Sequence, residues 1–188
     1  MPLPSFSLAT ADGSLHHFPT GRHALLCFVK EDCPTCVLSM PLIQAAAEAF
    51  GESIDIWCIG QDAEGNARLA ATFALAAPML DDSSLHVSYR YDLDTVPTII
   101  LADAIGDELD RFIGFGRSDW QALFQRLITV TLSPAPVVDW SRYPESRPGC
   151  GSKSVEPGIA ERLEAEMEGS PIRARRIDVG ESDDIFEF

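Results

Sequence analysis

Two cysteines, Cys33 and Cys36, lie three residues apart at the junction between two apolar segments of different character. The preceding segment, 24–30, has the continuous apolar composition of a buried strand, and the following segment, 35–50, is typical of a helix. The first cysteine is therefore expected in the opening turn of that helix. There it faces unpaired backbone N–H groups and the positive end of the helix macrodipole, which both favour a thiolate.

The spacing of this pair predicts dithiol–disulfide chemistry. A second cysteine three residues later lies on the same face of a helix, close enough to form a small disulfide ring. We expect Cys33 to act as the attacking thiolate and Cys36 as the resolving thiol that releases a substrate. We also expect Cys33 to be exposed, and therefore to be alkylated before Cys36, Cys27 and Cys58.

A metal site and an inert cysteine pair are the competing interpretations. A structural zinc site normally has four Cys or His ligands, often as two paired clusters. The remaining cysteines occur singly, and the adjacent pair His16 and His17 would point to opposite faces of a strand. We therefore expect no bound metal and no cofactor.

The bulk composition is that of an ordinary globular chain. Apolar residues make up 46% and charged residues 23% of the 188 residues. A net charge of −15 disfavours nucleic acid and anionic membrane surfaces as partners. No segment is long enough to cross a bilayer, and the first residues lack the pattern of a signal peptide. The chain has five cysteines, an odd number that does not fit a framework of disulfides. Together these features predict reduced thiols and a cytoplasmic location.

Strand and helix patterns alternate along residues 1–131. A turn at 11–14 between two short apolar segments predicts a hairpin, and Ser118 is expected to cap the last amphipathic helix. Residues 80–91 are polar and predict an irregular segment. This order predicts an α/β domain with a mixed central sheet flanked by helices. The expected strands are 54–60, 97–101 and 108–113 besides 24–30, and the expected helices are 35–50, 63–76 and a last one that begins at 118.

With its CxxC at the first strand–helix junction, this order resembles the thioredoxin superfamily, and more narrowly the redoxin group of TlpA/ResA-type thiol–disulfide oxidoreductases. The resemblance covers residues 3 to about 130. It rests on the following motifs: Gly21-Arg22, Cys33-Pro34-Thr35-Cys36, Asp81-Asp82-Ser83, Tyr89-Arg90-Tyr91, Thr95-Val96-Pro97-Thr98, Asp103 with Gly106, and Phe112-Ile113-Gly114. It implies a thioredoxin-like fold and a protein or small-molecule disulfide or dithiol as substrate.

The resemblance also implies a substrate-binding surface. The family's proline that matches Pro97 forms a cis peptide bond and packs against the CxxC pair. Val96 would then present its backbone N–H and C=O to an extended substrate, which is a strand-addition mode of recognition. Pro34 and Thr35, between the two cysteines, complete the expected substrate-binding set.

This chain departs from thioredoxins at two positions. The residue before the first cysteine is Asp32, whose carboxylate should raise the pKa of Cys33 unless Lys30 or solvent offsets it. Cys27 occupies the position of a buried acid, so proton transfer at Cys36 is expected to differ, through Glu31 or water.

Two other functions are compatible with the same fold. One is an interaction module in which the CxxC pair is not catalytic. The other is a peroxiredoxin-type peroxidase, which is disfavoured because the threonine three residues before the peroxide-reactive cysteine would fall on Cys33.

Residues 132–188 form an extension of different composition. Proline-rich, linker-like segments lead to a loop that contains Cys150, and Pro157 is expected at the first position of one short helix. Ile159, Leu163 and Met167 form an apolar stripe that should dock on the domain, on a second copy in a homodimer, or on a further domain downstream. Cys150 is a candidate additional redox thiol, which could relay electrons to or from the CxxC pair if its loop reaches Cys33.

Overall fold

The structure is a computed structural model that describes residues 2–168. Its centre is a five-stranded mixed sheet. The strand order is β5 (Met79–Asp81), β4 (Asp55–Gly60), β3 (Ala24–Val29), β7 (Thr98–Ala102) and β8 (Glu108–Ile113). Strands β5, β4 and β3 run parallel to one another, β7 runs antiparallel to β3, and β8 runs antiparallel to β7. This mixed sheet confirms the predicted α/β class.

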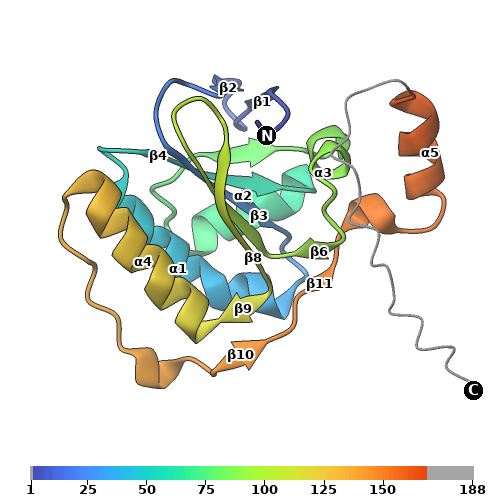
Figure 1. The fold of residues 1–188 in the computed structure, drawn as a ribbon. Helices are drawn as coiled ribbons and strands as arrows, with labels where there is room; N and C mark the ends of the chain where they lie inside the picture. Colours follow the sequence, from blue (N-terminus) through green and yellow to red (C-terminus); the bar gives the residue numbers. More distant parts are fainter. Residues whose placement is uncertain (1, 169–188) are drawn as a thin grey trace, which may run out of the picture.

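Two long helices, α1 (Pro34–Phe50) and α4 (Arg117–Thr131), lie side by side on one face of the sheet (Figure 1). Phe50 of α1 and Phe124 of α4 meet with ring centroids 6.3 Å apart. All six residues of β3 are buried, as a central strand covered on both faces requires. The other helices of the domain are α2 (Ala63–Thr72) and α3 (His86–Arg90), and the predicted hairpin is formed by β1 (Phe6–Ala9) and β2 (Leu15–Phe18).

The segment expected to be irregular, 80–91, contains regular structure instead. Residues 80 and 81 belong to β5, and residues 86–90 form α3. The buried carboxylate of Asp82 accepts hydrogen bonds from the backbone N–H groups of Val87 and Ser88 at 3.1 and 2.7 Å. A buried acidic side chain can therefore support a one-turn helix that the polar composition of the segment does not predict.

Several predicted helix ends are wrong by one or more residues. Gly116, not Ser118, is the N-cap of α4, and no side chain caps this helix. Helix α2 ends at Thr72 rather than at 76, because Ala74 adopts a positive φ of 45°. The final helix, α5 (Ile159–Glu166), begins two residues after Pro157. Helix ends depend on local geometry that a hydrophobic pattern does not resolve.

The C-terminal extension leaves α4, passes along one edge of the domain and ends with α5 on the opposite side (Figure 1). Its elements are the 3₁₀-helix η1 (Trp140–Arg142), β10 (Ser146–Arg147), β11 (Cys150–Gly151), the 3₁₀-helix η2 (Lys153–Val155) and α5. Trp140 and Tyr143 anchor its first part, since Trp140 packs on Phe124 of α4 and Tyr143 stacks on Phe115.

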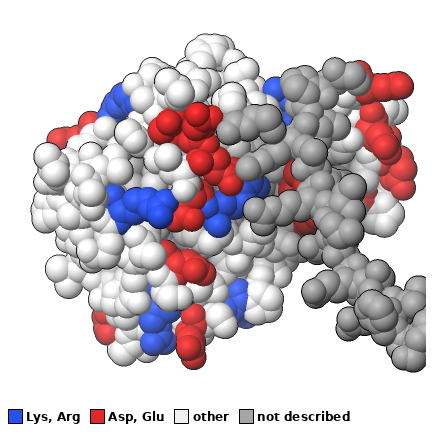
Figure 2. All heavy atoms as spheres, in the orientation of Figure 1, with Lys and Arg blue, Asp and Glu red and all other residues white. Residues whose placement is uncertain are grey.

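Helix α5 docks through one residue of the predicted apolar stripe. Leu163 is fully buried, whereas Ile159 and Met167 are only partly buried. His86 of α3 lies 3.1 Å from the carboxylate of Glu166, which ties this helix to the domain. The outer face of α5 carries a row of acidic side chains (Figure 2). The charged segments 173–176 and 181–188 lie outside the described residues.

Candidate active site

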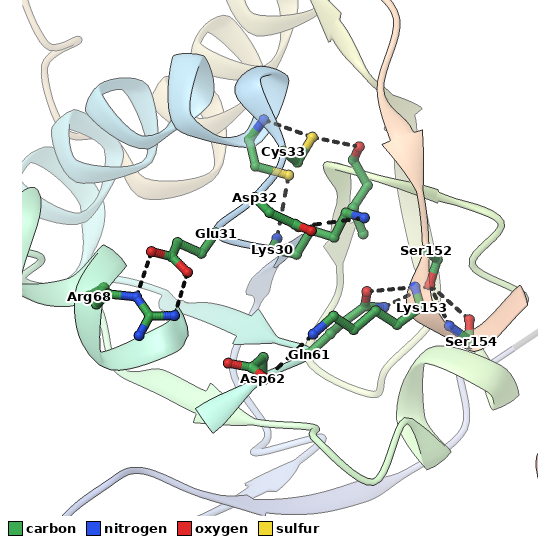
Figure 3. Close-up of polar contacts among 12 residues, drawn as sticks. Lys30, Glu31, Asp32, Cys33, Gln61, Asp62, Arg68, Ser152, Lys153 and Ser154 are labelled. Atoms are coloured by element: carbon green, nitrogen blue, oxygen red, sulfur yellow. Dashed lines mark hydrogen bonds and ion pairs between the residues drawn. The ribbon is translucent and has the colours of Figure 1, made fainter. Parts of the chain in front are cut away.

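Cys33 is the N-cap residue of α1, at the end of the loop that follows β3. Its sulfur accepts a hydrogen bond from the backbone N–H of Cys36 at 3.3 Å, which is the interaction expected of a capping side chain (Figure 3). Pro34 occupies the first helical turn, where its missing N–H costs nothing. The sulfur of Cys36 accepts a hydrogen bond from the backbone N–H of Lys30 at 3.4 Å.

The two cysteines of the pair differ strongly in acidity. The pKa of Cys33 is lowered to about 5, first by a hydrogen bond from the Cys36 side chain and then by one from Cys150 and by backbone N–H groups, while burial acts in the opposite direction. The pKa of Cys36 is raised far above its ordinary value by burial and by its interactions with Cys33. At neutral pH the pair therefore holds a thiolate on Cys33 and a thiol on Cys36.

Neither acidic residue before Cys33 prevents this ionisation. Lys30 pairs with Asp32 at 3.5 Å, and the Asp32 side chain is 69% exposed, so its charge is offset by both partner and solvent. Glu31 makes two hydrogen bonds to the Arg68 guanidinium at 2.6 and 2.7 Å. This pairing lowers the pKa of Glu31 and engages the carboxylate that was one of the two expected proton acceptors for Cys36, the other being water.

The loop before β7 faces the sulfur of Cys33. The Val96–Pro97 peptide bond is cis, and the Val96 carbonyl oxygen lies 3.5 Å from Cys33 Sγ, within reach of the thiol when it is protonated. Val96 itself belongs to the short strand β6 (Thr95–Val96). The carbonyl of Pro97 accepts a hydrogen bond from Gly114 N–H at 2.8 Å, which ties the loop to the end of β8.

The C-terminal extension covers this site. Strand β11 pairs antiparallel with β6, so that Cys150 is the Cα partner of Val96. The hydroxyl of Thr35 donates a hydrogen bond to the Pro148 carbonyl at 2.7 Å. Cys33 has no exposed surface beneath this segment. The expectation of an exposed Cys33 is therefore wrong, because a segment more than one hundred positions away in sequence lies over it.

The structure brings together every residue that the sequence analysis placed at the site, including Cys150. Sequence reasoning missed the residues that hold the extension in place. Gly149 is one of them, and its position between Pro148 and Cys150 was the only local signal, since a glycine allows close backbone approach. Gln61 is another, and its amide donates to the Ser152 hydroxyl at 2.7 Å and accepts from Lys153 N–H at 3.0 Å (Figure 3).

The remaining two cysteines lie in the core. Cys27 of β3 and Cys58 of β4 are Cα partners in neighbouring parallel strands, and both are fully buried. Burial raises the pKa of Cys58 to about 12 and that of Cys27 well above its ordinary value, so both remain neutral thiols. Within residues 2–168, no group of three or more His, Cys, Asp or Glu side chains is arranged to hold a metal ion. No helix in this range is long and apolar enough to span a membrane.

A mixed sheet in the order β5-β4-β3-β7-β8, with a CxxC pair at the start of α1 facing the Val96–Pro97 loop, defines a thioredoxin-like fold. Solved structures of thiol–disulfide proteins share it. A Chlorobium tepidum protein assigned as a thiol:disulfide interchange protein DsbE has a TM-score of 0.62 at 24% identity, covering 69% of this chain and 95% of its own.

Two further similar structures come from other bacteria. StoA from Bacillus subtilis has a TM-score of 0.55 at 22% identity, covering 63% of this chain and 97% of its own. A secreted Mycobacterium tuberculosis disulfide oxidoreductase has a TM-score of 0.56 at 18% identity, covering 66% of this chain and 95% of its own. Comparison with models of protein families and with curated proteins found no match.

Proposed function

We propose that this protein is a thiol–disulfide oxidoreductase that uses the Cys33–Cys36 dithiol/disulfide couple. The observation that carries the proposal is the asymmetry of the pair: Cys33 accepts a backbone N–H at the helix N-cap and has a pKa lowered to about 5, whereas Cys36 is a buried thiol. A low-pKa cysteine with a protonated partner three residues later is the arrangement that thiol–disulfide exchange requires.

The reaction proceeds in two exchange steps. The Cys33 thiolate attacks one sulfur of a substrate disulfide, forming a mixed disulfide and releasing the other substrate sulfur as a thiolate, which takes up a proton. Cys36 then loses its proton and attacks Cys33 Sγ, which releases the second substrate thiol and leaves the Cys33–Cys36 disulfide. Two electrons pass from the pair to the substrate, and the reverse sequence oxidises a substrate dithiol.

Formation of the mixed disulfide itself prepares Cys36 for the second step. Two causes of its raised pKa are the hydrogen bond to Cys33 and the negative charge of Cys33, and both vanish once Cys33 is bonded to the substrate. The N–H of Lys30 remains as a donor to Cys36 Sγ at 3.4 Å and stabilises the thiolate that forms. Burial, the largest cause of the raised pKa of Cys36, remains, so we infer that the Cys36 proton passes through water to the departing substrate thiolate as the second disulfide forms.

The surroundings of Cys33 favour a polypeptide disulfide as substrate. Strand β6 can pair with an extended segment, as its pairing with the short strand β11 shows. A substrate segment would take the place of β11. A surface pocket of about 460 Å³ beside the pair can accept a side chain of such a segment. Its lining residues are Glu31, Asp32, Pro34, Val37, Leu38 and Arg147.

A second candidate function is an interaction module with a non-catalytic CxxC pair. The burial of Cys33 beneath the extension favours it, because a nucleophile without exposed surface is protected from substrates. The two functions differ in what Cys33 contributes, since only the oxidoreductase needs its sulfur to react.

Reduction of insulin by dithiothreitol, followed as turbidity, tests the proposal. We expect Cys33→Ser to abolish the catalysed rate, and Cys36→Ser combined with Cys150→Ser, which leaves no resolving thiol at the site, to accumulate mixed disulfides with substrate. Cys58→Ala, at a fully buried cysteine of β4 that contributes no surface to the site, is the matched control and should retain the wild-type rate. A Cys33→Ser protein that reduces insulin as fast as wild type would favour the interaction module.

A further inference from the structure

The extension occupies the site as an extended polypeptide substrate would. Strand β11 pairs antiparallel with β6 on the side where Val96 faces Cys33, and the preceding Pro148 carbonyl accepts the Thr35 hydroxyl at 2.7 Å. The backbone of the segment therefore contacts both the Val96–Pro97 loop and the helix turn between the two cysteines. These two surfaces together are the substrate-binding set predicted from the sequence.

The close approach of this segment depends on Gly149. A Cβ atom at this position would lie 2.5 Å from the Val96 carbonyl oxygen and 2.5 Å from Thr95 Cγ2, closer than real Cβ contacts allow. At Gly151, two residues later, a Cβ atom would meet nothing within 4 Å. Only the first of these two glycines is therefore needed to seat Cys150 opposite Val96.

Cys150 is brought close to Cys33 by this register. Cys150 is the Cα partner of Val96, and the Val96 carbonyl oxygen lies 3.5 Å from Cys33 Sγ. Cys150 also contributes to the lowered pKa of Cys33, after the larger effect of the Cys36 side chain. All three are free cysteines in the structure. The strand position opposite Val96, where an extended substrate would pair, thus carries a cysteine of the chain itself.

The segment that carries Cys150 is held at both ends. Before it, Arg147 of β10 pairs with Phe115 of β9 (Phe115–Gly116). After it, the N–H of Ser152 donates to the Asp94 carbonyl at 2.9 Å, and its buried hydroxyl accepts from the Gln61 amide. Such anchoring keeps the cysteine near Cys33 at a high effective concentration.

We propose that the extension is an internal substrate of the site and that Cys150 is a third redox-active thiol, which forms a disulfide with Cys33. The proposal rests on the proposed oxidoreductase function, since it needs a reactive Cys33. When Cys33 carries a mixed disulfide, the deprotonated Cys150 attacks Cys33 Sγ, the Cys33–Cys150 bond forms and the bound thiol leaves. Subsequent attack of Cys36 on Cys33 Sγ returns Cys150 to its thiol form and yields the Cys33–Cys36 disulfide.

Oxidised glutathione provides a direct test in the full-length Cys36→Ser protein. Cys33 attacks the reagent and acquires one glutathione, with release of the other as a thiol. Cys150 then displaces the bound glutathione, so that two protein thiols become one disulfide and one oxidised glutathione becomes two reduced molecules. Intact mass spectrometry and peptide mapping should find a Cys33–Cys150 disulfide without bound glutathione. The matched Cys36→Ser/Cys150→Ser protein should instead retain one glutathione on Cys33.

The possible outcomes separate this inference from the function on which it rests. A Cys36→Ser protein that keeps its glutathione while Cys150 is freely alkylated would overturn the internal-substrate role and leave the oxidoreductase intact. Absence of glutathione on the double variant, together with absence of a Cys33–Cys150 disulfide in the Cys36→Ser protein, would remove the reactive Cys33 and thereby both proposals.

The two glycines supply a second, independent test that leaves every cysteine in place. In the Cys36→Ser background, Gly149→Ala should slow release of glutathione by about tenfold or more, because it weakens the backbone pairing that seats Cys150. Gly151→Ala adds the same methyl group in open space and should release glutathione at the parent rate. Equal rates in the two variants would show that the register of the extension does not govern the exchange, and would overturn the proposal.

Discussion

Cys150 and Val96 are directly opposite one another in an antiparallel strand pair, although they come from the extension and from the thioredoxin-like domain. The pairing places a third thiol on the substrate side of Cys33 and removes Cys33 from solvent. We expect the reactivity of the pair to depend on whether the extension is docked. Four predictions concern the acidity of these thiols and the contacts that hold the extension in place.

The pH dependence of alkylation should distinguish the thiols. The pKa of Cys33 is lowered to about 5, and that of Cys150 is raised by burial and by its interaction with Cys33. With limiting iodoacetamide, modification of Cys33 should rise with a midpoint near pH 5 and stay constant above about pH 7, whereas Cys150 should still gain reactivity in the alkaline range. Quantitative peptide mapping from pH 4 to pH 10 measures both; a Cys33 midpoint near 9 would contradict the lowered pKa that the Cys36 side chain and the backbone N–H groups produce.

The reduced protein should become more stable as the pH rises from about 5 to about 9. Cys33 has a folded-state pKa of about 5, below the ordinary thiol value of 9.0, so the unfolded chain binds one more proton between these limits. The stabilisation is fully present above the unfolded pKa and is lost as the pH falls through the folded pKa. Urea unfolding of reduced wild type and Cys33→Ser should diverge with increasing pH; a constant difference would refute this linkage.

Leu163→Ala should release the extension and expose Cys33. Leu163 is the fully buried residue of α5, and replacing a buried leucine by alanine typically costs roughly 2–5 kcal/mol. We expect faster proteolysis within residues 150–168 and faster alkylation of Cys33 at neutral pH. Val137→Ala removes apolar atoms from a fully exposed side chain of the same extension and should change neither rate. Identical Cys33 alkylation in both variants would mean that docking of α5 does not protect the site.

Gln61→Leu should loosen the extension from its C-terminal side. The buried Gln61 amide bonds the hydroxyls of Ser88 and Ser152 and the Lys153 N–H, and unpaired buried polar groups cost about 1–3 kcal/mol each. We expect a lower urea midpoint and faster hydrogen exchange at residues 150–154. Gln121→Leu, at an exposed position on α4, is the control and should leave both unchanged. A wild-type exchange rate in Gln61→Leu would argue against this anchor.

Much of the domain could be predicted because its determinants are local. The apolar run of β3, the cysteine spacing and the following amphipathic segment predicted both the strand–CxxC–helix unit and the low pKa of Cys33. Adjacent residues produce the strand–CxxC–helix unit. The pKa of Cys33 is lowered first by the Cys36 side chain, which this unit supplies, although the distant Cys150 contributes as well. Helix α3 was missed for the opposite reason, since it depends on the buried side chain of Asp82.

The sequence by itself determined the candidate site residues: a cysteine at the N-cap of α1, a second cysteine one turn later, and a Val96–Pro97 pair before a core strand. Only the tertiary structure decided that Cys33 is buried and that Cys150 is its neighbour. Strand β11 has two residues, too few for local propensity to specify a partner. Its position is set instead by Gly149, Thr35 and Gln61, three contacts that exist only after distant parts of the chain have folded together.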